Sequence, residues 1–274
     1  MRRFIFCTLL CSAFLSKAQV AATDWKVNFP KDELKVSNLP DRENVWVFML
    51  AGQSNMAGRG FVEPTDTLAN NRIYTINNKG EMILAKEPLH WYEPTLTGLD
   101  CGLSFGRTLL NGIPENISIL LIPTAVGGSS INQWLGDSTY RGVPLFTNFK
   151  EKVALAQSYG KIKGILWHQG ESDASEAGIQ IHSEKMKTLF EEFRYVINDA
   201  SLPILVGELG SFTLNDDRWQ AMNKAIQQYV VSDSNAYFVR TNDLTGKADR
   251  IHFDGKSQRE LGRRFAQTYL KARK

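Results

Sequence analysis

Short runs of almost uniformly apolar residues punctuate the chain. Because these runs do not alternate between apolar and polar positions, they are typical of parallel strands covered on both faces. The pattern therefore predicts a mainly parallel sheet of about five strands. The five runs are VWVFMLA (45–51), ISILLIPT (117–124), KGILWH (163–168), LPILVGE (202–208) and AYFVRT (236–241).

Amphipathic segments fill the gaps between these runs. Their apolar residues recur at steps of three and four, which predicts helices. Ser257 followed by Glu260 predicts a capping box at the start of the last helix. The alternation of strands and helices indicates an α/β fold with helices on both faces of the sheet. The segments with helical spacing are 147–158, 183–198, 217–231 and 257–271.

The N-terminal residues follow a different pattern. Arg2 and Arg3 precede the apolar run FIFCTLLCSAFL, and Ser16 and Ala18 place small residues at alternate positions. This order is that of a secretory signal peptide, so we expect cleavage after Ala18 and a secreted or periplasmic protein. A buried N-terminal helix is the alternative.

The rest of the chain divides into a short lead-in and one domain. Residues 19–44 are polar and contain two prolines, which predicts an extended segment. Residues 45–274 contain no repeat, low-complexity tract or linker, which favours a single domain. No segment after the N-terminus is apolar and long enough to cross a bilayer, so we expect no membrane contact after cleavage of residues 1–18.

Charge narrows the range of partners. The chain has 32 Lys and Arg residues against 29 Asp and Glu. Loss of Arg2, Arg3 and Lys17 with the signal peptide would leave the mature protein close to neutral. No basic stripe remains to bind phosphates, which argues against nucleic-acid binding. Nothing in the sequence indicates an obligatory protein partner.

Cysteine usage removes two further possibilities. Cys7 and Cys11 lie in the predicted signal peptide, and Cys101 is the third cysteine of the chain. A mature protein with one cysteine can form no internal disulfide and no cysteine-based zinc site.

Polar, glycine-containing loops follow each apolar run. Ligands of open parallel sheets bind at the carboxyl ends of the strands, near the point where the strand order reverses. These loops are therefore where functional residues are expected. They are GQSN (52–55), AVGGSS (125–130), QGESD (169–173), ELGS (208–211) and NDLTGKADRIHFD (242–254).

The loops contain the parts that acyl transfer requires. Ser54 follows a buried run at a turn that Gly52 permits, which makes it a candidate nucleophile. His252 is a candidate base, and Asp249 three residues earlier is placed to orient its Nδ1 atom. The alternatives are a serine that caps a helix and a surface histidine beside a helix-capping aspartate.

Other loop residues are candidate donors to a developing oxyanion. Gly127 and Gly128 allow a backbone amide to approach a ligand, although glycine pairs also form plain turns. The side-chain amide of Gln169 is another candidate donor. Glu171 either anchors its loop or competes with Asp249 as the carboxylate that serves the histidine.

Four of these motifs together resemble the SGNH-hydrolase superfamily. More narrowly, they are similar to carbohydrate acetylesterases of the sialate O-acetylesterase and acetylxylan esterase (family 6) type. The resemblance covers residues 45 to 270 approximately and implies a flavodoxin-like three-layer α/β/α sandwich. The motifs, in order, are GQSNMAGRG, GGSSINQW, WHQGESD and DRIHFD.

The resemblance also implies roles for individual residues. It makes Ser54 the nucleophile, His252 the general base and then acid, and Asp249 the third member of the triad, with Glu171 as the alternative acid. It implies an oxyanion hole of three donors: the amides of Ser54 and Gly128 and the side chain of Gln169. The mechanism that it implies needs no metal and no organic cofactor.

Residues near the expected site supply candidate contacts to substrate. Trp91 and Trp134 lie in neighbouring loops and either stack on sugar rings or pack the loops. Gln53, Asn55 and Gly127 complete the expected substrate-binding set, and Asn55 is also placed to support the residues beside it.

The sequence thus predicts a secreted serine esterase that removes acetyl groups from acetylxylan or a related plant polysaccharide through an acetyl-enzyme. A sialate 9-O-acetylesterase is the alternative within the class. A lipase-like or thioesterase-like enzyme and a non-catalytic carbohydrate-binding relative are further alternatives.

Overall fold

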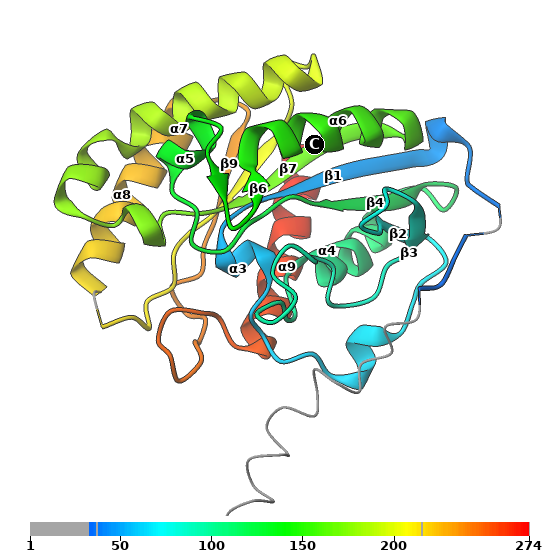
Figure 1. Ribbon diagram of the computed structural model, residues 1–274, viewed down its shortest axis with the longest axis horizontal. Helices are drawn as coiled ribbons and strands as arrows, with labels where there is room; N and C mark the ends of the chain where they lie inside the picture. Colours follow the sequence, from blue (N-terminus) through cyan, green and yellow to red (C-terminus); the bar gives the residue numbers. More distant parts are fainter. Residues whose placement is uncertain (1–32, 37, 215, 274) are drawn as a thin grey trace, which may run out of the picture. The chain divides into compact units, whose positions relative to one another are not determined.

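A computed structural model describes residues 33–36, 38–214 and 216–273 (Figure 1). The predicted signal peptide, residues 1–18, and most of the lead-in lie outside these residues. In the described part of the lead-in, the carbonyl of Leu34 accepts a hydrogen bond from the amide of Leu84. None of the helices in the described residues has the length and apolar character that a membrane span requires.

A seven-stranded sheet forms the centre of the fold. All neighbouring strands in it are parallel except one edge pair, β2 with β3. In spatial order the strands are β3 (Met82–Leu84), β2 (Ile73–Ile76), β4 (Ser118–Pro123), β1 (Val45–Gly52), β7 (Lys161–His168), β8 (Ile204–Gly207) and β9 (Ala236–Val239).

The five predicted strands are β1, β4, β7, β8 and β9, and they confirm the predicted fold class. Numbered in chain order, they lie in the spatial order 2-1-3-4-5, which is the flavodoxin-like doubly wound order. Every residue of β1 and β4 is buried, which explains why their sequences are apolar throughout.

The sequence analysis missed the two edge strands, β2 and β3. They have four and three residues, which is too short for a periodic signal. β2 also contains Thr75, a polar residue that is buried because its hydroxyl donates to the carbonyl of Leu121 at 2.9 Å. A small separate hairpin, β5 (Thr139–Tyr140) and β6 (Val143–Pro144), was also not predicted.

Helices cover both faces of the sheet, as Figure 1 shows. The two faces are packed by two separate hydrophobic clusters. The helices of one face are α5 (Ile131–Leu135), α6 (Leu145–Tyr159), α7 (Glu176–Ile197) and α8 (Asp216–Ser232), and those of the other are α4 (Gly102–Leu109) and α9 (Gly255–Ala272). The described residues therefore form the expected α/β/α sandwich.

The start of α9 differs from its prediction. The helix begins at Gly255, and Asp254 is its N-cap, with a carboxylate that accepts the amide of Ser257 at 2.8 Å. The predicted capping box of Ser257 and Glu260 is therefore wrong, because the helix begins earlier than its apolar periodicity. The earlier start fixes the backbone two residues after His252.

The two central strands β1 and β7 lie where the strand order reverses. Their carboxyl ends are close together, since a Cβ atom on Gly52 would lie 2.1 Å from the carbonyl oxygen of His168. Gly52 also has a φ of 134°, which side chains rarely adopt. Only glycine fits here, and the chain leaves β1 directly beside the end of β7.

One buried histidine on α7 has no role in shaping this edge. His182 is fully buried, and neither of its ring nitrogens has a hydrogen-bond partner among the described residues. Burial lowers the pKa of His182 to about 4, because the charged imidazolium loses its hydration. The His182 ring is therefore protonated less readily in the folded protein than in the unfolded chain.

We predict that His182 makes the fold sensitive to acid. The free energy of unfolding is not reduced by His182 above pH 6.5, where the ring is neutral in both states. As the pH falls towards 4 the unfolded chain takes up the proton first, and the free energy of unfolding is lower by about 2 kcal/mol at pH 5. Replacing His182→Leu should remove that loss. Urea unfolding at pH 7.5 and pH 5 measures it, and a variant whose stability relative to wild type is the same at both pH values would contradict the prediction.

Candidate active site

Ser54 lies at the carboxyl end of β1 as the first residue of the one-turn helix α3 (Ser54–Ala57). The N-cap position belongs to Gln53, which makes no side-chain capping bond, so Ser54 is not the helix-capping serine of the alternative interpretation. The amide of a first helical residue has no partner within the helix. The Ser54 amide also has none elsewhere in the described residues.

The side chain of Ser54 meets His252, which is 198 positions away in the sequence. His252 Nε2 lies 3.0 Å from Ser54 Oγ, and His252 Nδ1 lies 3.0 Å from Asp249 Oδ2. Because an ionised carboxylate only accepts hydrogen bonds, Nδ1 carries the proton and Nε2 is left to accept from the serine hydroxyl. A nucleophile, a base and an orienting carboxylate are thereby in hydrogen-bond contact, which is the geometry that nucleophilic catalysis requires.

Asp249 is held as an anion by its own loop. The amides of Ile251 and His252 both donate to its Oδ1 at 3.0 Å. Partial burial raises the pKa of Asp249, but the hydrogen bonds from the His252 ring and from these two amides outweigh it and lower the pKa to about 2. The turn needs a left-handed residue, and Arg250 has a φ of 55°. Asp249 is therefore ionised at neutral pH.

Asn55 fastens the histidine loop to the end of β1. Its Nδ2 donates to the carbonyl of Ile251 at 3.1 Å and to Glu171 Oε1 at 2.6 Å, and its Oδ1 accepts the amide of Phe253 at 3.0 Å. Asn55 is fully buried. It therefore positions His252, and the expectation that it contacts substrate is corrected.

Glu171 serves other residues than His252. Besides Asn55, its Oε1 lies 3.6 Å from Nδ1 of the buried His168. No hydrogen bond among the described residues joins Glu171 to His252. The structure brings Asp249, and not the alternative acid Glu171, to the imidazole.

The glycine-rich loop after β4 offers one free amide rather than two. The Gly127 amide donates to Glu93 Oε2 at 2.6 Å, so Gly127 is corrected from a substrate contact to a fixed point of the loop. Gly128 has a φ of 81°, and its amide has no acceptor among the described residues. Its carbonyl accepts the hydroxyl of Ser172 at 3.0 Å. The Gly128 amide therefore stays available to a ligand.

Gln169 and Gln53 are committed to the protein. Gln169 Nε2 donates to Gln53 Oε1, to the carbonyl of Ser129 and to Asp173 Oδ2, at 3.2, 3.3 and 2.5 Å. Both glutamines are buried, and Gln53 Oε1 also accepts the amide of Ser172 at 3.2 Å. The expectations that Gln169 donates to an oxyanion and that Gln53 binds substrate are corrected, because these side chains tie neighbouring loops together.

Sequence reasoning named Trp91 but did not identify that the segment around it braces the glycine-rich loop. Three of its side chains contact the backbone at alternate residues, from the last residue of β4 into the loop: Tyr92 with the Pro123 carbonyl at 3.1 Å, His90 with the Ala125 amide at 3.3 Å, and Glu93 with the Gly127 amide. The polar residues within LHWYE (89–93) are the signal that could have identified this segment.

Glu93 is the charged member of the bracing segment. It is buried and paired with the buried Arg59, whose Nη2 lies 2.7 Å from Glu93 Oε2. Burial raises the pKa of Glu93, but Arg59 and the Gly127 amide hold it below its usual value. The loop is therefore fixed by an ion pair that is shielded from solvent.

The two candidate tryptophans occupy different environments. Trp134 is fully buried among Phe149, Trp167 and Phe193, and its Nε1 donates to Ser129 Oγ at 3.0 Å. The expectation that Trp134 stacks on a sugar is wrong, because its rings fill the core. Trp91 is half-buried, and its role as a sugar platform stays a prediction.

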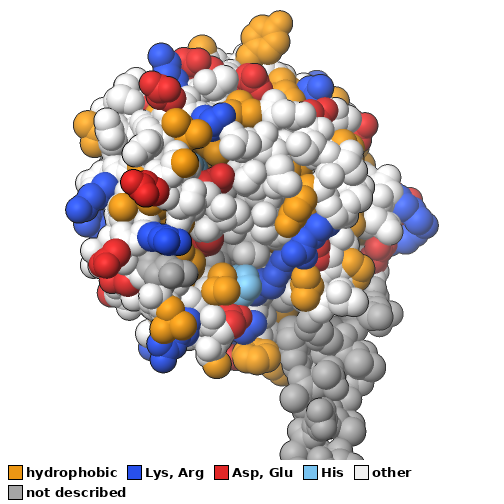
Figure 2. All heavy atoms as spheres, turned by 60° about the vertical axis from the view of Figure 1, so that its left-hand side comes forward, with side chains coloured by type: hydrophobic (Ala, Val, Ile, Leu, Met, Phe, Trp, Pro, Cys, Tyr) orange, Lys and Arg blue, Asp and Glu red, His pale blue; other side chains and the backbone are white. Residues whose placement is uncertain are grey.

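Accessibility separates His252 from the other histidines. His90, His168 and His182 are buried, whereas His252 is half-buried. Figure 2 shows imidazole atoms at the surface of one face, bordered by basic and hydrophobic side chains. The structure thus leaves one histidine within reach of a ligand.

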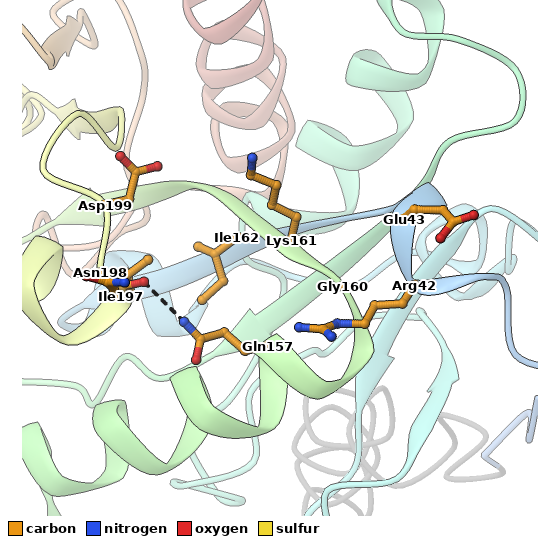
Figure 3. A pocket seen from close by; sticks show the side chains of 9 residues that line it. All are labelled: Arg42, Glu43, Gln157, Gly160, Lys161, Ile162, Ile197, Asn198 and Asp199. Carbon is orange, nitrogen blue, oxygen red and sulfur yellow. Dashed lines mark hydrogen bonds between the residues drawn. The ribbon is translucent and has the colours of Figure 1, made fainter.

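A cavity of about 570 Å³ lies at the opposite edge of the sheet and is lined by residues that include Arg42, Gln157 and Lys161 (Figure 3). Lys161 begins β7 and Ser54 follows the end of β1, so this cavity is at the amino ends of the strands. Within the described residues, no group of three or more His, Cys, Asp or Glu side chains is arranged to hold a metal ion.

The strand order, together with a serine, a histidine and a carboxylate in contact at the carboxyl edge, defines a hydrolase of the SGNH class. A family model described as "Carbohydrate esterase, sialic acid-specific acetylesterase" matches residues 44–271, and the chain belongs to this family. By the description of its family it is a carboxylic ester hydrolase of the carbohydrate esterase type.

Individual relatives agree with this assignment. "Probable carbohydrate esterase At4g34215" of Arabidopsis thaliana is 28% identical over 243 residues, which are 82% of this chain and 90% of the relative. Its crystal structure has a TM-score of 0.75 and covers 84% of this chain and 98% of its own. NanS shares the fold, with a TM-score of 0.67 at 20% identity over 85% of this chain and 98% of its own.

We predict that the buried carboxylate of Glu93 contributes more to the free energy of unfolding than a carboxylate in a solvent-exposed ion pair does. Glu93→Gln leaves the buried Arg59 without a neutralising charge and should lower the free energy of unfolding by about 3 kcal/mol. Chemical denaturation measures the loss. The matched control is Glu63→Gln, which weakens a solvent-exposed pair with Arg259 and should cost less than about 1 kcal/mol. Equal losses in the two variants would contradict the prediction.

Proposed function

We propose that the protein is a serine esterase that removes O-acetyl groups from carbohydrates, with Ser54 as nucleophile, His252 as general base and Asp249 as the carboxylate that orients it. The observation that carries the proposal is the chain of contacts from Ser54 Oγ through the imidazole to Asp249, at 3.0 Å in each step. The free amides of Ser54 and Gly128 support it as donors to the oxyanion.

The reaction proceeds in two halves. Ser54 Oγ attacks the acetyl carbonyl carbon while His252 Nε2 takes the hydroxyl proton, and the carbonyl oxygen becomes an oxyanion. The bond to the sugar oxygen then breaks, and His252 returns the proton to that oxygen. Water attacks the acetyl-serine with His252 again as base, and acetate leaves as Ser54 regains its proton. Asp249 stabilises the imidazolium that forms in each half.

The polar residues of the surrounding loops favour a small acyl group. A lipase-like or thioesterase-like enzyme would need a long apolar channel beside the serine, whereas the loops after β1, β4 and β7 are rich in glycine, amides and hydroxyls. Acetyl esters of carbohydrates fit this composition, and the family and the Arabidopsis relative are named for carbohydrate esters.

We infer acetylxylan or a related plant polysaccharide as the substrate, because the chain lacks a large inserted module between its motifs. A sialate 9-O-acetyl ester is the second candidate, and the description of the family favours it. The N-terminal sequence further suggests that the enzyme acts outside the cytoplasm, after cleavage at Ala18.

The first prediction tests the nucleophile. Ser54→Ala should abolish release of acetate from p-nitrophenyl acetate and from acetylated xylan, with a loss of about 10⁶-fold in kcat, because no other group forms the acyl-enzyme. The same variant should no longer react with a fluorophosphonate probe, while its thermal unfolding stays that of wild type. Ser201→Ala, at an exposed serine before β8, is the control and should keep full activity. Near-normal turnover by Ser54→Ala would refute the assignment.

The second prediction separates the two candidate acids. Asp249→Asn should lower kcat about 10³-fold or more, because a neutral amide neither fixes the imidazole tautomer nor stabilises its charge. Glu171→Gln keeps an acceptor for Asn55 and should lower kcat only about tenfold. Because the pKa of Asp249 is about 2, its own protonation should not appear in a kcat/KM profile above about pH 4. A larger loss in Glu171→Gln than in Asp249→Asn would reverse the assignment.

A further inference from the structure

Two cavities adjoin each other at the end of α7. A second cavity, of about 490 Å³, shares Asn198 and Asp199 with the cavity at the amino ends of the strands. Figure 3 shows these two residues at one side of the first cavity and Arg42 and Glu43 at the other. Both volumes fall within the range of about 300–1,000 Å³ that is typical of ligand sites. We call the two cavities together the amino-edge groove.

The amino-edge groove lies far from Ser54. Asp199 precedes β8 and Asn235 precedes β9, so the second cavity, like the first, is at the amino ends of the strands. The central strands β1 and β7 have eight residues each. Because a strand rises about 3.3 Å per residue, the groove is roughly 25 Å from the reacting groups. A ligand in the groove therefore does not occupy the place of the acetyl group.

Tyr195 presents a free aromatic ring at the second cavity. It lines this cavity, and it is 86% exposed. Its side chain makes no hydrogen bond and no ring contact with another described residue. A tyrosine ring combines an apolar face with a polar tip, which suits it to a ligand that has both C–H and O–H groups. A sugar ring is such a ligand.

Unused hydrogen-bonding groups line the same cavity. The side chain of Arg194 is 10% exposed, and it donates from Nε to the Leu202 carbonyl at 3.1 Å and from Nη1 to Asp233 at 2.7 Å. Its buried Nη2 has no partner among the described residues. The side-chain amides of Asn198 and Asn235 make no hydrogen bond to a described residue either. A ligand with several oxygen atoms would satisfy these donors, and an unsatisfied buried donor costs stability.

The charges that line the amino-edge groove nearly cancel. Three basic side chains stand against four acidic ones, so no excess of positive charge attracts a polyanion. Most of the lining residues are polar or charged, which favours a neutral ligand that is rich in hydroxyl groups. The basic residues are Arg42, Lys161 and Arg194, and the acidic residues are Glu43, Glu191, Asp199 and Asp233.

We propose that the amino-edge groove is a second carbohydrate-binding site, which holds a neutral stretch of the polysaccharide whose acetyl esters are cleaved at Ser54. A polymer held there stays on the enzyme while other parts of the same chain reach Ser54, so the effective concentration of its esters rises. A small ester gains nothing, because it cannot span roughly 25 Å. The inference rests on the proposed function, which makes a carbohydrate ester the substrate.

The first test measures binding of neutral oligosaccharides that carry no acetyl ester. Calorimetry with xylohexaose, mannohexaose and cellohexaose should show that at least one of them binds the enzyme with a Kd of about 1 mM or lower. Hexagalacturonic acid, an anionic oligosaccharide of the same length, should bind at least about tenfold more weakly. The inference is overturned if none of the three neutral hexaoses binds, or if the anionic one binds best.

Variants then locate the bound hexaose. Tyr195→Ala removes the ring, and Asn198→Gly removes an amide at a position whose φ of 59° suits glycine. Each should raise the Kd about tenfold, whereas Tyr195→Phe, which keeps the ring, should stay within about threefold of wild type. Ile181→Ala, at an exposed position earlier on α7, is the control and should bind as wild type does. An unchanged Kd in both Tyr195→Ala and Asn198→Gly would place the ligand elsewhere and refute the inference.

Kinetics on a polymer distinguishes this inference from the proposed function. The substrates are p-nitrophenyl acetate and the acetylated polymer of the sugar whose hexaose binds. Tyr195→Ala should lower the polymer-to-small-ester ratio of kcat/KM about tenfold, through the KM of the polymer. An unchanged ratio, or a wild-type enzyme that cleaves no such polymer, overturns the inference alone. Ser54→Ala should still bind the hexaose, and full esterase activity of that variant would instead overturn the proposed function.

Discussion

The hydrogen bonds of Asn55 hold the beginning and the end of the domain together at one edge of the sheet. This one buried side chain contacts the backbone on both sides of His252 and the carboxylate of Glu171. Because its partners are about two hundred positions away in one case and over a hundred in the other, they meet only in the folded chain. If one of these hydrogen bonds is lost, a buried donor or acceptor is left without a partner, and the folded protein is less stable. The position of the imidazole therefore depends on complete folding of the sheet.

A second set of contacts fixes the position of the glycine-rich loop after β4. His90, Tyr92 and Glu93 reach its backbone from a segment that itself carries no motif of the family resemblance. The free Gly128 amide follows a neighbour whose amide is tied to Glu93. A donor fixed in this way needs no rearrangement when charge develops opposite it, which is how preorganised amides stabilise an oxyanion. The buried Arg59–Glu93 pair thus links the stability of the fold to the geometry of the site.

The fold was largely predictable from sequence because each central strand is covered on both faces. A strand that is buried on both faces has apolar residues at nearly every position, and such runs are visible in the sequence. β2 and β3 were not predicted, because they are short edge strands and Thr75 interrupts the apolar pattern of β2. The sequence also placed Ser54, His252 and Asp249 after predicted strands, and the structure brings these three side chains into contact at the expected edge, while their catalytic roles stay a proposal. The orientation of individual side chains was not predictable. Gln53, Asn55, Gln169 and Trp134 lie in the right motifs, but a sequence does not reveal whether a polar group faces a ligand or another loop.

That difference explains why the motifs contain more polar residues than the chemistry uses. Loops that meet at a sheet edge bury backbone amides and carbonyls, and these need partners as much as the reaction does. Gln53, Asn55 and Gln169 supply such partners, so their side-chain amides join the loops to one another. Some buried polar atoms beside the site still have no hydrogen-bond partner among the described residues, and Gln169 Oε1, Glu171 Oε2 and His168 Nδ1 are three of them. These three atoms lie at the end of β7 and in the loop after it. Because each buried polar atom without a partner costs stability, this edge of the sheet is locally less stable than a fully paired one would be.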